Sequence, residues 1–168
     1  MTRALLVLRH GEAAGERGGS GDFNRPLTRE GASDAARVGC EMKARGWIPD
    51  HVLYSSAQRT QETVVAVLAE LGIALTNARV RSEKMLYNAP LDVLLHFVSG
   101  CPSHVHRVLI VGHNPGLEQL VEYLADAPPL RKSNGKLMTT AALACLQTQA
   151  NWRELGRGGA HLEALLRD

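Results

Sequence analysis

The chain has 168 residues, which is enough for one domain with its own core, so we expect a single domain spanning residues 1–168. Nineteen Lys and Arg against seventeen Asp and Glu leave a formal charge of +2, too small an excess to predict a nucleic-acid partner. The first apolar run, residues 4–8, is too short for a signal peptide or a membrane span, so we expect no membrane partner.

The three cysteines predict a reducing compartment. Cys40, Cys101 and Cys145 are odd in number, lie far apart in the chain, and each has apolar neighbours. Buried, reduced thiols usually have this pattern, so we expect a cytoplasmic protein.

The first third of the chain predicts a strand, a loop and a helix. Residues 4–8 form an apolar run that stops at a charged turn, as a buried central strand does. Residues 11–21 contain too many glycines for regular structure, and we interpret them as a flexible loop that Pro26 closes. Thr28 then begins a helical pattern that continues to about Arg45.

Strands and helices continue to alternate after that helix. We expect strands at residues 52–54, 78–81, 107–111 and 136–146, and helices at residues 57–71, 90–98 and 116–124. This alternation predicts an α/β fold, a three-layer sandwich with a mostly parallel central sheet and helices on both faces.

Polar motifs directly follow the apolar strands. Arg9-His10-Gly11 ends the first strand, Gly112-His113-Asn114 ends the strand at 107–111, and Arg59 comes just after the strand at 52–54. Ligands bind at the carboxyl ends of strands in open α/β sheets, so the three motifs can converge. Two imidazoles and two guanidiniums suit a phosphoryl group, because Arg offers paired donors and His can attack or donate.

The polar residues can also be interpreted as surface residues that have no role in a site. Arg59 in a first helical turn would usually be a surface cation, although the positive end of the helix makes that position unfavourable without an anion. His104 and His106 imitate a metal pair, but no other ligand falls at a suitable spacing, so we expect no metal site. We interpret them as surface histidines, as we do the remaining three, His51, His96 and His161.

The motifs resemble the histidine phosphatase superfamily, whose hallmark is Arg-His-Gly at the end of the first strand. The resemblance to its SixA-type phosphohistidine phosphatases covers nearly the whole chain and rests on Arg9-His10-Gly11, Arg25-Pro26-Leu27-Thr28, Ser56-Ala57-Gln58-Arg59-Thr60, Gly112-His113-Asn114-Pro115 and Met138-Thr139-Thr140-Ala141-Ala142. It implies a phosphatase without metal or cofactor.

The resemblance also implies a role for each site residue. His10 takes the phosphoryl group, Arg9 and Arg59 bind its oxygens, and His113 completes the pocket. Arg25 matches a further arginine of the SixA-type pocket. The helix that starts after Asn114 is expected to add backbone N–H groups, so we place Asn114 among the phosphate-binding residues.

The expected mechanism has a covalent phosphohistidine intermediate. A neutral His10 attacks, and the arginines with a protonated His113 hold the equatorial oxygens. The general acid is left open between Glu83 and Glu12, because Glu83 can equally be a solvated charge beside Arg81 and Lys84, and Glu12 can simply balance the local arginines.

The substrate class is also left open by the sequence. We expect phosphohistidine or another phosphoprotein, with a histidine-phosphotransfer protein as one candidate partner, because an imidazole leaves with little acid assistance. A phosphomonoesterase for a sugar phosphate or nucleotide, with Glu83 as its acid, is the first alternative. A non-catalytic phosphate-binding module and a phosphoglycerate mutase are weaker ones. The oligomeric state is not predicted.

Overall fold

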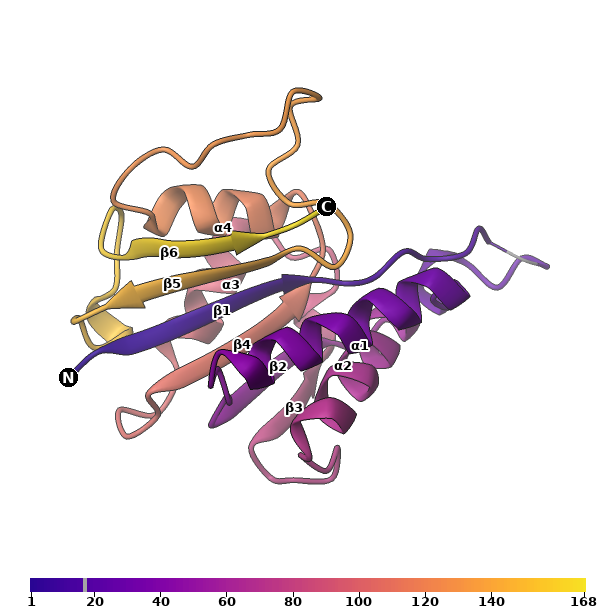
Figure 1. Cartoon of the computed structure of the whole chain (residues 1–168), viewed down its shortest axis with the longest axis horizontal. Coiled ribbons are helices and arrows are strands. Elements are labelled where there is room, and N and C mark those ends of the chain that lie inside the picture. The colour runs from indigo at the N-terminus through magenta and orange to yellow at the C-terminus, as the bar shows by residue number, and fades with distance from the viewer. Residues whose placement is uncertain (17) are drawn as a thin grey trace.

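The computed structural model describes residues 1–16 and 18–168 as one α/β unit (Figure 1). Helices, strands and three short 3-10 helices follow one another in the order β1 (Arg3–Arg9), η1 (Asp22–Asn24), α1 (Arg29–Ala44), β2 (His51–Ser55), α2 (Gln58–Leu71), β3 (Val80–Glu83), η2 (Lys84–Leu86), α3 (Leu91–Ser99), β4 (Arg107–Gly112), α4 (Gly116–Leu124), β5 (Leu143–Thr148), η3 (Trp152–Glu154) and β6 (His161–Leu166).

The six strands form one mixed sheet in the order β3-β2-β4-β1-β5-β6. β1, β2, β3 and β4 are parallel, whereas β5 pairs antiparallel with β1 and β6 pairs antiparallel with β5. β1 and β4 lie at the centre, and Arg9 stands in register with Gly112 at their carboxyl ends. The two polar motifs that follow these strands are therefore neighbours.

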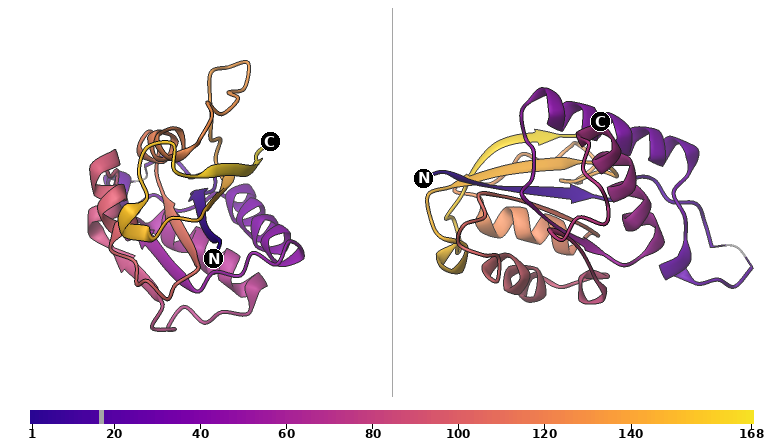
Figure 2. Two further views of the ribbon diagram at one scale, coloured as in Figure 1. Left: turned by 90° about the vertical axis from the view of Figure 1, so that its left-hand side faces the viewer. Right: turned by 90° about the horizontal axis from the view of Figure 1, so that it is seen from below.

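Helices cover both faces of the sheet (Figure 2, right). Successive side chains of a strand point to opposite faces, and β1 shows this directly. Leu5 and Val7 belong to a core shared with α3 and α4, while Leu6 and Leu8 belong to a core shared with α1 and α2. The expected three-layer α/β fold is confirmed.

Local sequence sets the ends of the two helices beside the site. The Thr28 hydroxyl accepts a hydrogen bond from the Gly31 N–H at 2.9 Å and so caps α1. Gly72 ends α2 with φ 69°, in the left-handed region that favours glycine. Both helix positions agree with the sequence interpretation.

The last third of the chain differs from the expectation. Residues 136–142 are not part of a strand, and β5 begins only at Leu143. Ala141 has φ 58°, which breaks an extended chain, and the Met138 carbonyl accepts hydrogen bonds from side chains of the site. The edge strand β6, His161–Leu166, was not predicted.

One cysteine also differs from the expectation. Cys101 and Cys145 are buried, but Cys40 is exposed on α1, where its thiol donates to the Glu70 carboxylate at 3.3 Å. The prediction of a buried Cys40 is wrong, because this position of α1 faces away from the sheet. In the described residues no helix has both the length and the apolar character that crossing a membrane requires.

Candidate active site

A cavity of about 300 Å³ opens where β1 and β4 end. It brings together most of the residues that the sequence predicted for the site, and it is lined by Arg9, His10, Glu12, Ala13, Arg25, Arg59, Asn88, His113, Asn114 and Thr140. The convergence follows from the topology. His10 directly follows β1, His113 directly follows β4, and Arg59 lies in the first turn of α2, just after β2.

The His10 ring is held in one tautomer. Its Nδ1 lies 2.7 Å from the Gly11 carbonyl oxygen, which can only accept, so Nδ1 carries the proton. Its Nε2 lies 3.3 Å from the Arg59 Nε, which can only donate, so Nε2 carries a lone pair. The nitrogen with the free electron pair is therefore the one that faces the guanidinium.

His10 is also neutral at ordinary pH. Its ring is buried, and burial, together with the positive charges of Arg59, Arg9 and Arg25, lowers its pKa to about 4 against the opposing hydrogen bond to Gly11. A histidine with a lowered pKa keeps its lone pair through the neutral range. Both requirements of an attacking nitrogen, its tautomer and its charge state, are thus met before any ligand arrives.

His113 lies beside His10, with the ring centroids 5.3 Å apart. Its Nδ1 lies 3.3 Å from Nη2 of Arg59 and must accept, so the neutral ring carries its proton on Nε2, which donates to the Ser55 hydroxyl at 2.7 Å. Burial, followed by the neighbouring His10 and Arg59, lowers the pKa of His113 to about 3. His113 was expected to be protonated when it holds a phosphoryl group, but in the free protein it is neutral.

Arg59 connects the two histidines. The residue is only 4% exposed, so the interpretation of Arg59 as a surface cation is wrong. The pair of nitrogens on one edge of its guanidinium, Nε and Nη2, reaches His10 Nε2 and His113 Nδ1, at 3.3 Å each. A bidentate edge of this kind matches two oxygens of a phosphoryl group.

Two further arginines border the cavity. Arg9 donates from Nη1 to the Met138 carbonyl at 3.1 Å, and Asn114 donates to the same oxygen at 2.8 Å. Arg25 donates from Nε to the Ala14 carbonyl at 2.7 Å. Arg9, Arg25 and Arg59 thus supply three positive charges around one small space.

The two candidate acids occupy different places. Glu12 lines the cavity, and its carboxylate accepts a hydrogen bond from the Thr28 hydroxyl at 2.9 Å. Glu83 is not among the residues that line this cavity, and it pairs with Arg81 at 2.8 Å. Glu83 thus agrees with its alternative interpretation, a surface charge beside Arg81. Glu12 is the candidate acid that lies at the cavity.

Several residues of the site were not predicted from the sequence. The Ser55 hydroxyl accepts from His113 Nε2 at 2.7 Å, and Thr63 accepts from the Gly11 N–H at 3.0 Å while it donates to the Arg59 carbonyl at 2.7 Å. Asp22 and Tyr87 meet behind Arg59. Ser55 adjoins a recognised motif, but Asp22 lies at the end of a loop whose composition indicated only flexibility.

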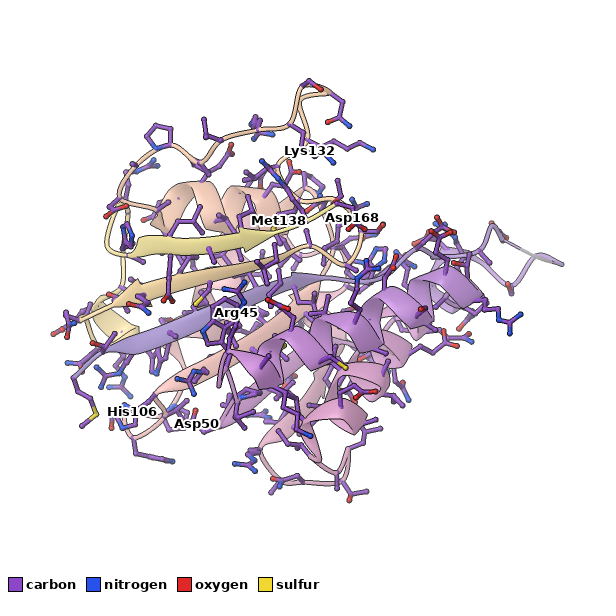
Figure 3. All side chains as sticks on the ribbon, in the orientation of Figure 1. Arg45, Asp50, His106, Lys132, Met138 and Asp168 are labelled. Carbon is purple, nitrogen blue, oxygen red and sulfur yellow. The ribbon has the colours of Figure 1, made fainter. Side chains whose placement is uncertain are left out.

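The remaining histidines lie away from the cavity lining. Asp50 and His106 lie close together at the end of the sheet opposite the cavity (Figure 3), where the Asp50 carboxylate accepts a hydrogen bond from the main-chain N–H of His106 at 3.0 Å. His96, His104 and His161 are exposed, and His51 and His106 are half-buried. Among the described residues no three His, Cys, Asp or Glu side chains are grouped in a way that could hold a metal ion.

Comparisons with known proteins agree with this geometry. Residues 5–83 match the model of the histidine phosphatase superfamily, branch 1. An uncharacterised chloroplast protein of Arabidopsis thaliana is 31% identical over 99% of this chain and 78% of its own length.

Two solved structures are similar over almost the whole chain. A candidate phosphohistidine phosphatase SixA from Nakamurella multipartitia is 29% identical with a TM-score of 0.81, covering 99% of this chain and 96% of that one. Another from Agrobacterium tumefaciens is 25% identical with a TM-score of 0.83, covering 99% and 98%. The likeness therefore extends well beyond the segment that the family model matches.

Proposed function

Because the chain belongs to the histidine phosphatase superfamily, we propose that it is a phosphatase for phosphohistidine, or for another phosphorylated side chain, of a protein substrate. The comparisons confirm the family that the sequence motifs indicated, and they support phosphatase activity. The individual residue roles and the substrate class are our proposal. The observation that carries it is the lone pair of His10 Nε2, presented to the cavity beside Arg59.

The first step transfers the phosphoryl group to His10. The Nε2 lone pair forms the new N–P bond while the bond from phosphorus to the substrate nitrogen breaks, and that nitrogen keeps the electron pair. Positive charge develops on the His10 ring, where the Gly11 carbonyl accepts the Nδ1–H at 2.7 Å and stabilises it. Arg9, Arg25 and Arg59 hold the phosphoryl oxygens.

His113 supports the same oxygens once they arrive. In the free protein its Nδ1 carries a lone pair and accepts from Arg59. A phosphoryl dianion beside this nitrogen favours its protonation, since an opposite charge nearby stabilises the charged ring. The protonated Nδ1 then donates to the phosphoryl group.

The second step returns His10 to its starting state. Water attacks phosphorus, the N–P bond breaks, and its electron pair returns to Nε2. The oxygen of the water becomes the fourth oxygen of inorganic phosphate, and Glu12 accepts the proton that the water releases. Glu12 lies on the cavity wall with its carboxylate fixed by Thr28, which suits it to this task.

The leaving group favours a phosphohistidine substrate. An imidazole has a pKa near 6.5, whereas an alcohol leaves as a base many units stronger, at about 1.4 kcal/mol per unit. Glu83, the carboxylate that an alkyl substrate was expected to need, is paired with Arg81 instead. A cavity of about 300 Å³ is at the lower limit of small-molecule pockets and suits a phosphoryl group with the ring that carries it.

A phosphomonoesterase for a small metabolite is the second candidate. The observation in its favour is again Glu12, since a protonated Glu12 can donate its proton to the leaving alkoxide and, as the carboxylate, take one from water in the second step. In this alternative Glu12 takes the role that the sequence assigned to Glu83.

A substrate panel tests the proposal. The wild type is assayed for phosphate release from a phosphohistidine peptide, a phosphoserine peptide, sugar phosphates and nucleotides, with His10→Asn as the control for contaminating phosphatases. We expect the highest kcat/KM on the phosphohistidine peptide. A sugar phosphate or nucleotide as the best substrate would replace this proposal with the metabolite alternative. Binding of tungstate without any turnover would indicate a phosphate-binding module.

A further inference from the structure

The Asp22 carboxylate lies behind the cavity and joins two of its arginines. Its Oδ1 accepts from Arg25 Nη1 at 3.0 Å, and its Oδ2 accepts from Arg59 Nη2 at 3.1 Å. We propose that Asp22 is a positioning residue, which holds Arg25 and Arg59 at the separation that a phosphoryl group requires. This inference rests on the proposed function of the cavity.

The Arg59 guanidinium uses two different edges. Its Nε and Nη2 face His10 and His113, as described above, whereas Nη1 and the second hydrogen of Nη2 face Asp22. The Asp22 main-chain oxygen accepts from Nη1 at 2.8 Å, so Asp22 holds this outer edge with two acceptors. A phosphoryl group can take the inner edge while the grip of Asp22 on the outer edge remains.

Arg25 is held in a comparable way. Besides its contact with Asp22, it donates from Nε to the Ala14 carbonyl at 2.7 Å. Asp22 is the residue that both guanidiniums share. A single carboxylate with one oxygen for each arginine therefore fixes their spacing.

Asp22 is itself held from the opposite side. The Tyr87 hydroxyl donates to Asp22 Oδ2, and the Tyr87 ring packs edge-on against Phe23 with centroids 5.0 Å apart and against His113 at 5.4 Å. Hydrogen bonds from Tyr87 and Arg25 hold the pKa of Asp22 well below its usual range, so it stays ionised. Tyr87 thus connects the 3-10 helix η1, which carries Asp22, to the body of the fold.

A carboxylate beside arginines can also act as a competing anion, which the substrate must displace. Asp22 does not fit that role, because it is not among the residues that line the cavity and it holds the edge of Arg59 that points away from the two histidines. The two roles make opposite predictions. Removal of a competitor strengthens anion binding, whereas removal of a positioning group weakens it.

Asp22→Asn separates these outcomes with probes that do not depend on the natural substrate. Tungstate binding is measured by calorimetry and hydrolysis of an aryl phosphate by steady-state kinetics. The amide still accepts from one arginine but presents N–H groups to the other, so the spacing is lost. We expect tungstate to bind roughly tenfold more weakly and kcat to fall by roughly 10- to 100-fold, because small misplacement of binding groups is costly.

Two further variants complete the experiment. Tyr87→Phe keeps the charge of Asp22 but removes the hydrogen bond from the Tyr87 hydroxyl to Asp22 Oδ2. We expect a smaller loss of tungstate affinity and kcat than in Asp22→Asn. Asp34→Asn removes the same charge from another Asp–Arg pair at i and i+3, with Arg37 at 3.0 Å on α1, and we expect no change. Thermal unfolding of each variant checks that the fold is retained.

The outcomes are distinguishable. Unchanged or tighter tungstate binding and unchanged kcat in Asp22→Asn would overturn the positioning role while leaving the phosphatase intact. A loss of kcat equally large in Asp34→Asn would also overturn it. A wild type that neither binds tungstate nor hydrolyses any phosphate would contradict the proposed function itself.

Discussion

Arg59 Nε donates to His10 Nε2 at 3.3 Å, inside a cavity where both residues are buried. The contact shows which nitrogen of His10 has the lone pair, and the nearby cation helps to keep that nitrogen unprotonated. A phosphoryl group that replaces the contact meets the nucleophile and a binding guanidinium together. Catalysis by this site depends on that exchange.

Glu12 is expected to matter in proportion to the basicity of the leaving group. Glu12→Gln should reduce kcat/KM, which reports phosphoryl transfer to His10, by about 10²- to 10⁴-fold for an alkyl phosphate, the usual value of general acid catalysis, and much less for a phosphohistidine peptide. Steady-state kinetics with an aryl phosphate as the third substrate measures the trend. Glu83→Gln, which breaks only the pair with Arg81, is the matched control. Equal effects of both substitutions on all three substrates would remove Glu12 from the mechanism.

The two neutral histidines are expected to weaken the fold in mild acid. Their pKa values in the native state are lowered to about 4 for His10 and about 3 for His113. In the unfolded chain each histidine has its ordinary pKa of about 6.5, so below that pH the unfolded chain binds protons that the native state does not bind. Each can lower the free energy of unfolding by up to about 1.4 kcal/mol per pH unit between pH ~6.5 and ~4. Urea unfolding at neutral and mildly acidic pH measures this fall in the free energy of unfolding.

The double variant His10→Gln/His113→Gln is the control for this pH dependence. Its free energy of unfolding should fall less over the same pH interval, because it lacks the two imidazoles whose pKa is lowered in the native state. A slope as steep as that of the wild type would show that the effect comes from other residues.

Gly11 is expected to tolerate no side chain. A Cβ at this position would lie 2.5 Å from the Gly31 carbonyl oxygen, and the three nearest atoms all belong to the main chain of Gly31, so none of them can turn away. Gly11→Ala should lower the free energy of unfolding by about 1–3 kcal/mol, as overpacking does, and should also reduce activity because Gly11 orients His10. Gly15→Ala is the control, since a Cβ there meets nothing within 4 Å. Equal stability of both variants would contradict this expectation.

Activity is expected to be independent of metal ions. The positive charge of the site comes from Arg9, Arg25 and Arg59, which all line the cavity. Assays with a chelator should therefore give unchanged kcat, and vanadate or tungstate should compete with substrate. Loss of activity in the chelator that a divalent metal restores would rule out this mechanism.

Much of the site could be predicted from the sequence, because parallel strands bring their carboxyl ends to one edge. Once the strands are recognised, the polar motifs at their ends can be expected to converge, and the pairing of β1 with β4 in the structure makes His10 and His113 neighbours, with Arg59 at the start of α2 joining them. The residues that orient these groups, such as Asp22, were missed. Asp22 lies on the short 3-10 helix η1 and Tyr87 directly follows η2, and such short segments have no periodicity that would place a side chain.

The C-terminal region was also harder to predict. Residues 136–142 are apolar enough for a strand, but their backbone serves the site instead, through the Met138 carbonyl and the Ala141 N–H that donates to the His10 carbonyl at 2.9 Å. The charge state of His113 was not predictable either. It depends on burial against His10 and Arg59, which only the assembled cavity shows.

The most direct test of this account is to trap the phosphoenzyme. Wild type and His10→Asn are incubated with a substrate labelled in the phosphoryl group, quenched, and analysed for protein-bound label. We predict label on His10 of the wild type that is labile in acid and stable in alkali, as a phosphoramidate is, and none on the variant. Label that persists in His10→Asn, or that is lost in alkali as an acyl phosphate is, would contradict His10 as the nucleophile.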